Sequence, residues 1–160
     1  MPVIEEVIEI AAPRADVFRF CHNVTRWSEW QEQVEAVELL GGNLVRSGSL
    51  LRIDARIGGG AVFSWDAEFV GYQMPIGSRL RVLDAAPSSP FAKGSEMSWQ
   101  LESVGNSTRF TWRWRYKPQG FLRNIADRLG GRTAAQRAIR RSLVNLKELI
   151  ESGRHITAAG

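Results

Sequence analysis

The clearest pattern along the chain is a stripe of mostly apolar positions between residues 119 and 151. Successive members are four or three residues apart, which keeps them on one face of an α-helix. They are Ile125, Leu129, Arg132, Gln136, Ile139, Leu143, Leu146 and Ile150. A helix of about 30 residues is roughly 45 Å long, and so long an apolar stripe needs a broad apolar surface beneath it. The pattern therefore predicts a long C-terminal helix that covers the rest of the protein.

The middle of this stripe is polar and thin. Arg132 and Gln136 stand where the period favours aliphatic side chains. Small residues surround them, namely Gly130, Gly131, Ala134, Ala135 and Ala138. A helix that has apolar contacts at both ends and a thin centre predicts a cavity beneath that centre.

A second interpretation of the same residues is a break in the helix. Gly130 and Gly131 are typical of a helix C-terminus, and Thr133–Gln136 fits the S/T-x-x-E/Q capping box that starts a helix. A break or kink at the glycine pair and an unbroken helix both leave the flanking apolar stripes intact, so the sequence leaves the two alternatives open.

The first quarter of the chain predicts two strands separated by two short helices. The elements are a strand at 3–10, a short helix after Pro13, a second short helix at 23–31 and a strand at 34–40. Trp27 and Trp30 in the second helix are three residues apart, so both rings lie on one side. Packing in the core and contact with a ligand near an entrance are both compatible with this position.

Residues 51–116 form successive segments in which apolar and polar residues alternate, separated by turn residues. This is the pattern of an antiparallel meander in which every strand has one apolar face. The apolar faces carry large rings, namely Phe63, Trp65, Phe69, Trp99, Trp112, Trp114 and Tyr116. So many rings under one helix need either close interdigitation or a gap. The chain therefore predicts an α+β fold: a curved seven-stranded antiparallel sheet, two short helices after its first strand, and the C-terminal helix over its concave face.

The outward faces of the same strands carry charges whose sign alternates from strand to strand. Acidic residues dominate at 66–68 and 96–102, and arginines dominate at 79–81 and 109–115. Opposite charges that face each other across a ladder predict direct pairing between strands adjacent in sequence. The two carboxylates at 66–68 are accordingly interpreted as ladder partners rather than as a catalytic pair.

The composition indicates one ordinary globular domain. The chain has 160 residues, of which 44% are hydrophobic and 24% are charged, and no apolar run approaches the ~18 residues that span a membrane. We expect a single domain at 1–160, with a flexible tail from about residue 153. The acidic start lacks a basic and then apolar signal segment, so we expect a cytoplasmic location. The lone Cys21 permits no internal disulfide and is expected to be a buried, inert thiol.

Charge and side-chain chemistry argue against several function classes. The net charge of +4 and a pI of about 9.8 raise the question of nucleic acid. Most cations of the C-terminal helix map to its solvent face, and no nucleic-acid motif is present, so we expect no nucleic-acid partner. His22, interpreted as a solvated helix-end residue, and His155 in the tail supply little basis for a zinc site or a histidine triad. Gly58–Gly60 predicts a hairpin turn because no G-K-[ST] follows, so we expect neither a metal nor a cofactor.

Several landmarks along the chain resemble those of one superfamily. They are Ile10–Pro13 before Val17–Phe18, Trp27 and Trp30 before Val34 and Val37, Gly48, Pro75 before Arg79–Leu80, Gly105–Arg109, and Leu146–Glu151. Together with the order of elements, they are similar over essentially the whole chain to the helix-grip superfamily (SRPBCC). This superfamily includes the START-like lipid-transfer domains, the birch-pollen-allergen fold and the polyketide cyclase/dehydrase proteins.

The resemblance implies a deep hydrophobic cavity between the sheet and the last helix, used for lipids, sterols, aromatic polyketides or plant metabolites. In aromatase members a polar residue such as an arginine typically orients the chain in the cavity. The inward strand positions of this sequence hold no arginine, which leaves Arg132 of the helix for that role.

The first functional hypothesis is binding of a hydrophobic, aromatic or lipid-like small molecule in this cavity, without stable insertion into a membrane. The predicted ligand contacts are Trp30, Phe63, Trp65, Phe69, Met97, Trp99, Trp112, Trp114, Tyr116, Arg132 and Gln136. Arg132 with Gln136 would orient a carboxylate, carbonyl or phenol, because a guanidinium holds a planar anion through two hydrogen bonds.

Two other hypotheses stay open. In the second, the cavity folds a poly-ketone chain for cyclisation or dehydration, with Tyr116 and Arg132 as the available candidates for acid–base chemistry. In the third, the aromatic face is the packed core of an interaction module. An exposed edge strand would also permit a homodimer.

Overall fold

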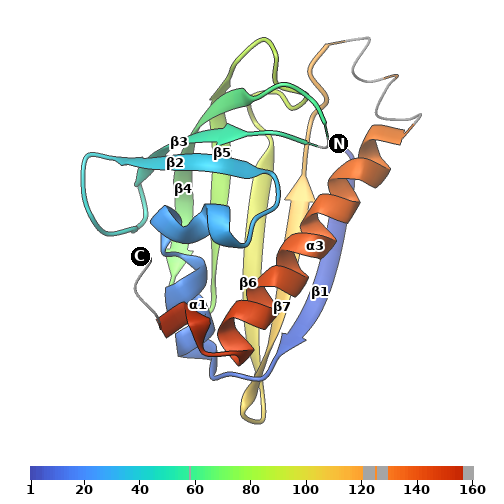
Figure 1. Cartoon of the computed structure of the whole chain (residues 1–160). Coiled ribbons are helices and arrows are strands. Elements are labelled where there is room, and N and C mark those ends of the chain that lie inside the picture. The colour runs from blue at the N-terminus through green and yellow to red at the C-terminus, as the bar shows by residue number, and fades with distance from the viewer. Residues whose placement is uncertain (58, 121–124, 126–129, 157–160) are drawn as a thin grey trace.

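The computed structural model describes residues 1–57, 59–120, 125 and 130–156 of the chain. Within them, an antiparallel sheet curves around one long C-terminal helix (Figure 1). The elements are β1 (Val3–Ile10), α1 (Arg14–Cys21), the 3₁₀ helix η1 (Val24–Glu29), β2 (Val34–Leu40), β3 (Leu50–Ala55), β4 (Phe63–Gln73), β5 (Gly77–Ala85), β6 (Glu96–Val104), β7 (Ser107–Arg115), α3 (Arg132–Glu151) and the 3₁₀ helix η3 (Arg154–Ile156). The predicted α+β helix-grip architecture is confirmed.

The sheet has the strand order β1-β7-β6-β5-β4-β3-β2, and neighbouring strands are antiparallel. α1 and η1 form the connection from β1 at one edge to β2 at the other (Figure 1). The period of two decides which face each side chain occupies. In β7, for example, Phe110, Trp112 and Trp114 are buried while Arg113 and Arg115 are exposed. β7 therefore contributes an apolar row to the concave face and a mostly charged row to the convex face.

The convex face carries the predicted ladder of alternating charges. Glu68, Arg81, Glu96 and Arg115 occupy facing positions on four successive strands, and Arg81 Nη2 lies 3.1 Å from Glu96 Oε2. On the β3 side, Arg52 Nε lies 3.0 Å from Asp66 Oδ1. Such exposed pairs contribute only about 0 to 1 kcal/mol each, so their value here is as evidence of register. The prediction of sequential pairing is confirmed.

The long helix α3 begins directly after the glycine pair. Gly130 has φ 153°, and the choice between a break at the glycine pair and an unbroken helix stays open, because residues 126–129 lie outside the described part of the chain. The predicted capping box is wrong, because Gly131 occupies the N-cap position and no side chain caps the helix. The Gln136 side chain instead donates to Glu6 Oε1 at 2.9 Å. Ile125 is exposed, and the predicted stripe position Leu129 lies outside the described residues.

Arg132 and Gln136 do not face the interior, which corrects the prediction that they anchor a ligand. Both lie against β1: Arg132 Nη2 donates to the Val3 carbonyl at 2.7 Å, and Gln136 reaches Glu6. Lys147 Nζ donates in the same way to the Glu9 carbonyl at 2.8 Å. The physical reason is that β1 is an edge strand with free backbone acceptors, which long polar side chains of α3 cover. A homodimer through an edge strand remains a prediction, although α3 already occupies two carbonyls of this edge.

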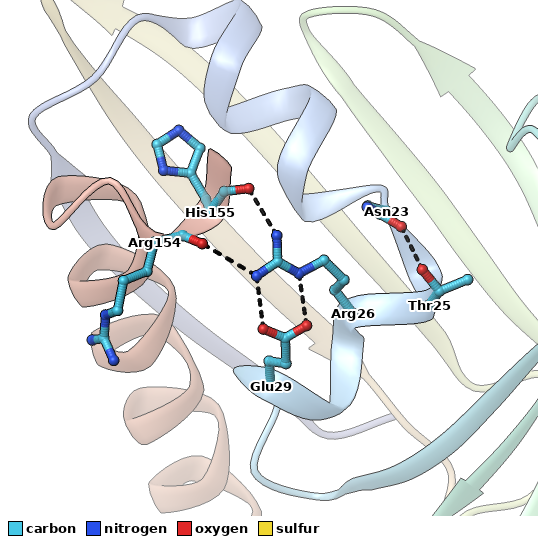
Figure 2. Close-up of polar contacts among 6 residues, drawn as sticks. All are labelled: Asn23, Thr25, Arg26, Glu29, Arg154 and His155. Carbon is cyan, nitrogen blue, oxygen red and sulfur yellow. Dashed lines mark hydrogen bonds and ion pairs between the residues drawn. The ribbon is translucent and has the colours of Figure 1, made fainter. Parts of the chain in front are cut away.

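The end of the chain is held by a buried arginine. Arg26 of η1 donates to both carboxylate oxygens of Glu29, to the His155 carbonyl at 2.8 Å and to the Arg154 carbonyl at 3.3 Å (Figure 2). Its guanidinium also lies 5.0 Å from the centroid of the Phe20 ring. Residues 153–156 are therefore a turn and η3 rather than part of a free tail, and the remainder of the predicted tail lies outside the described residues.

His22 is a core residue, so its prediction as a solvated helix end is wrong. It is only 5% exposed. Nδ1 donates to the Phe18 carbonyl at 2.8 Å, and Nε2 lies 2.7 Å from the Ser78 hydroxyl, from which it accepts. Burial favours the neutral ring and lowers the pKa of His22 to about 4. Cys21 is buried as predicted, and burial raises the pKa of its thiol.

Candidate functional site

A small pocket lies between the N-terminal half of α3 and the concave face of the sheet, with a volume of about 50 Å³. Its lining comes from η1, the segment after it, six strands, two loops and the helix. The lining residues are Trp27, Gln31, Gln33, Val34, Ile53, Ile57, Trp65, Leu80, Val82, Phe91, Met97, Trp112, Trp114, Ala135, Ala138 and Ile139. Almost all of these side chains are apolar, as is usual for sites that bind small molecules.

The helix leaves this space because its side chains there are short. Ala135 and Ala138 are buried and form the helix wall of the pocket together with Ile139. Farther along the same face, the buried positions include Leu143 and Leu146. The space therefore lies beneath the small residues of the helix, whereas larger side chains fill the region that follows.

Four of the predicted ligand contacts line the pocket. They are Trp65 of β4, Met97 of β6, and Trp112 and Trp114 of β7. These residues belong to the apolar rows that the alternation placed on the concave face. Their role in binding remains a prediction.

Five other predicted contacts are buried elsewhere in the core. They are Trp30, Phe63, Phe69, Trp99 and Tyr116. Ring packing explains much of this arrangement, because Trp30 and Trp99 lie 5.5 Å apart and each also packs on Trp112, at 6.0 and 5.5 Å between ring centroids. Such tilted and edge-to-face contacts fill the interior. Trp112 is thus the boundary between a packed aromatic cluster and the pocket.

A second group of rings surrounds the opposite end of the pocket. Phe91, in the loop between β5 and β6, packs on Trp65 and Trp114 at 5.7 and 5.2 Å. The loop is held in place by Ser89, whose hydroxyl accepts from Trp65 Nε1 at 2.8 Å and donates to the Phe91 carbonyl at 2.8 Å. Gln119 adds a hydrogen bond from Nε2 to the Ala86 carbonyl at 2.9 Å. These hydrogen bonds therefore hold the loop in place as part of the pocket wall.

Sequence reasoning missed the polar part of the lining, which is Gln31 and Gln33. Gln33 Nε2 donates to Gln31 Oε1 at 3.3 Å, and Ser142 of α3 lies 3.2 Å from Gln33 Oε1. Gln31 is only 3% exposed, and its Nε2 has no hydrogen-bond partner within the part of the chain that the structure describes. Both glutamines follow η1 in a short irregular segment, where neither the helical nor the strand period predicts a facing. No sequence signal could have found them.

The room in the pocket is smaller than the sequence led us to expect. A cavity of about 150 Å³ is known to admit benzene, and the present space is about a third of that. Met97 is the most adaptable part of the wall, since an unbranched thioether side chain changes rotamer easily. A ring-sized ligand therefore requires movement of the wall.

The sequence model for polyketide cyclase/dehydrase and lipid transport proteins matches residues 1–151. The chain belongs to this family. No curated protein sequence matches significantly. Within the described residues, no helix has the length and apolar character needed to cross a membrane.

Several solved structures have a similar fold over nearly the whole chain. The protein TTHA0849 from Thermus thermophilus has a TM-score of 0.78 at 18% identity, covering 99% of this chain and 100% of its own. A START superfamily protein from Mycobacterium smegmatis gives 0.71 at 14%, covering 94% and 97%. The ZhuI aromatase/cyclase from Streptomyces sp. R1128 gives 0.70 at 17%, covering 99% and 98%. At these identities the similarity establishes the fold alone.

Proposed function

We propose that this family member binds a largely apolar small molecule in the pocket beneath Ala135 and Ala138. The observation that supports this most directly is the position of the pocket: it lies where the helix carries its smallest buried side chains and the sheet its aromatic rows. Enclosure of a ligand there would contribute roughly 25 cal/mol per Å² of apolar surface removed from water. The cytoplasmic location expected from the sequence is part of this proposal.

Binding is favoured over cyclase or dehydrase chemistry by the character of the wall. Acid–base catalysis needs a titratable group within hydrogen-bond reach of the substrate. Among the described residues that line the pocket, none is an acid, a base or a tyrosine. The two candidates from the sequence lie off the wall, since Tyr116 is buried elsewhere and Arg132 is bonded to β1.

The experiment is native mass spectrometry of the protein purified from its natural host under gentle conditions. We expect a small apolar molecule to co-purify with the wild type. Ala138→Leu, which places three additional carbon atoms in the pocket, should remove it. Ala134→Leu is the matched control, because Ala134 is exposed on the same helix, and this variant should retain the molecule.

Two results would count against binding. One is wild-type protein without a bound molecule that also shows no thermal shift with a panel of aromatic lipophiles, which would support an interaction module with a packed core. The other is equal retention by Ala138→Leu and the wild type, which would place the molecule outside this pocket.

A further inference from the structure

Two buried polar groups that belong to pocket-lining residues have no hydrogen-bond partner among the described residues. Gln31 is 3% and Trp112 is 2% exposed. In residues 1–57, 59–120, 125 and 130–156, neither Gln31 Nε2 nor Trp112 Nε1 has a hydrogen-bond acceptor. Both residues line the pocket. Burying a donor without a partner is unfavourable, so a ligand atom that pairs with these groups would recover that cost on binding.

The Trp112 indole determines one hydrogen-bonding property that the ligand must have. An indole N–H donates only, so the ligand must present an acceptor to it. The amide of Gln31 is more adaptable because it belongs to a chain of contacts with Gln33 and Ser142. Rotating both amides by 180° keeps these contacts and exchanges the atom that Gln31 presents, from an N–H donor to a carbonyl oxygen.

The Ser142 hydroxyl permits both arrangements. In the first, its single proton is shared between the Ala138 carbonyl at 2.7 Å and Gln33 Oε1 at 3.2 Å. In the second, it donates to Ala138 alone, accepts from the Glu32 backbone N–H at 2.9 Å, and its second lone pair accepts from the rotated Gln33 amide. A ligand carbonyl fits the first arrangement, in which Trp112 and Gln31 both donate. A ligand hydroxyl fits the second, in which it accepts from Trp112 and donates to Gln31.

Charge restricts the ligand further. Within the described part of the chain, no lysine, arginine or histidine lines the pocket, and the cation predicted for this role, Arg132, is bonded to β1. A carboxylate or phosphate would enter without a counter-charge, which is strongly unfavourable in an apolar site. The chemistry of the wall therefore fits a neutral polar atom.

We propose that the pocket recognises one uncharged oxygen, a hydroxyl or a carbonyl, on an otherwise apolar ring compound, through the Trp112 indole N–H and the Gln31 amide. This inference rests on the proposed binding function. It replaces the arginine and carboxylate pairing expected from the sequence with neutral hydrogen bonds. It also makes Gln31 and Trp112 residues that determine ligand class.

Isothermal titration with four small probes tests the inference: benzene, phenol, acetophenone and benzoate. In the wild type, phenol or acetophenone should bind at least about tenfold more tightly than benzoate, because the anion lacks a counter-charge. Gln31→Met and Trp112→Phe should each weaken the favoured oxygen compound by about fivefold relative to benzene in the same variant, the effect of one neutral hydrogen bond. Loss confined to phenol would assign the hydroxyl, and loss confined to acetophenone the carbonyl; both support the inference.

Trp99→Phe is the matched control. Trp99 Nε1 is also buried without a partner among the residues described, but Trp99 does not line the pocket, so this variant should leave all four affinities unchanged. Two results would overturn the inference: phenol and acetophenone bind Gln31→Met and Trp112→Phe as tightly as they bind the wild type, or benzoate binds the wild type as tightly as phenol does. In either case, binding of benzene would still support the proposed function. No binding of benzene, phenol or acetophenone to the wild type would overturn both.

Discussion

The two halves of the interior beneath α3 contain the same kinds of side chains, but one half is a packed ring cluster and the other contains a pocket. In one half, which includes Leu143 and Leu146 of the helix, the rings around Trp99 are buried and pack against one another. Under Ala135 and Ala138, an equally aromatic wall encloses a space. The difference lies in the helix, which supplies branched side chains in one half and methyl groups in the other. A helix-grip fold can thus set the position of its pocket by the size of a few residues on one helix face.

The largest expected effect is loss of the ring at the centre of the packed half. Trp99→Ala should lower the free energy of unfolding by about 3 to 5 kcal/mol, because the ring is 1% exposed and packs on His22 and on other rings that cannot refill the space. Met97→Ala on the same face of β6 borders the pocket and should cost about 2 kcal/mol. Urea denaturation measures both, and equal costs would remove the distinction between the halves.

Acid should weaken the packed half through His22. Its pKa is about 4 in the folded protein and 6.5 when unfolded, so the neutral ring stabilises the fold fully above pH 6.5. As pH falls from 6.5 to 4, the unfolded chain binds a proton that the folded chain does not, and about 3 kcal/mol of stability is lost. Urea titrations at pH 7, 6 and 5 should show this slope in the wild type and lose it in His22→Gln. An identical slope in the variant would assign the loss to other groups.

A tight backbone contact distinguishes two glycines near the packed half. A Cβ on Gly77 would clash with the Trp99 carbonyl oxygen, whereas a Cβ on Gly71 would meet Arg79 Nε at 3.4 Å. Gly77→Ala should therefore cost about 1 to 3 kcal/mol, because backbone must move, and Gly71→Ala less than about 1 kcal/mol, because a flexible side chain can move. Thermal unfolding of the pair measures the difference. Equal melting temperatures would show that the contact is looser than described.

The smallest expected effect is filling of the pocket half. Ala138→Leu should change the free energy of unfolding by less than about 1 kcal/mol, since added carbon atoms enter existing space and leucine is a good helix former. Ala134→Leu on the exposed side provides the reference for helix propensity alone. A loss above about 2 kcal/mol relative to that reference would mean that the helix and sheet are as closely packed here as around Trp99.

The sequence predicted the strands and their faces well, because a period of two decides the facing of every residue in a regular strand. Trp112 and Trp114 were placed correctly on the concave face for this reason. The division of inward rings between pocket and packed cluster was not predictable, because it depends on how Trp30 and Trp99 interlock across distant segments. Arg132 was predicted to face the cavity, but its side chain bonds to the Val3 carbonyl at the β1 edge. The helical period gives no information about such backbone acceptors.

Two further residues show the limits of local patterns. His22 was expected in solvent, yet it is enclosed by contacts that include Ser78, 56 positions later in the chain. Gln31 follows η1 in a segment that lacks helical or strand periodicity, so its burial on the pocket wall could not be predicted from the sequence. Both errors concern polar side chains whose environment is created by tertiary contacts.

The most direct test of the contrast between the two halves is X-ray diffraction from crystals of the protein pressurised with xenon, which enters apolar cavities. We predict a xenon site bounded by Met97, Ala135 and Ala138, and none among the rings around Trp99. Absence of xenon beneath the two alanines, or a site inside the ring cluster, would contradict the account.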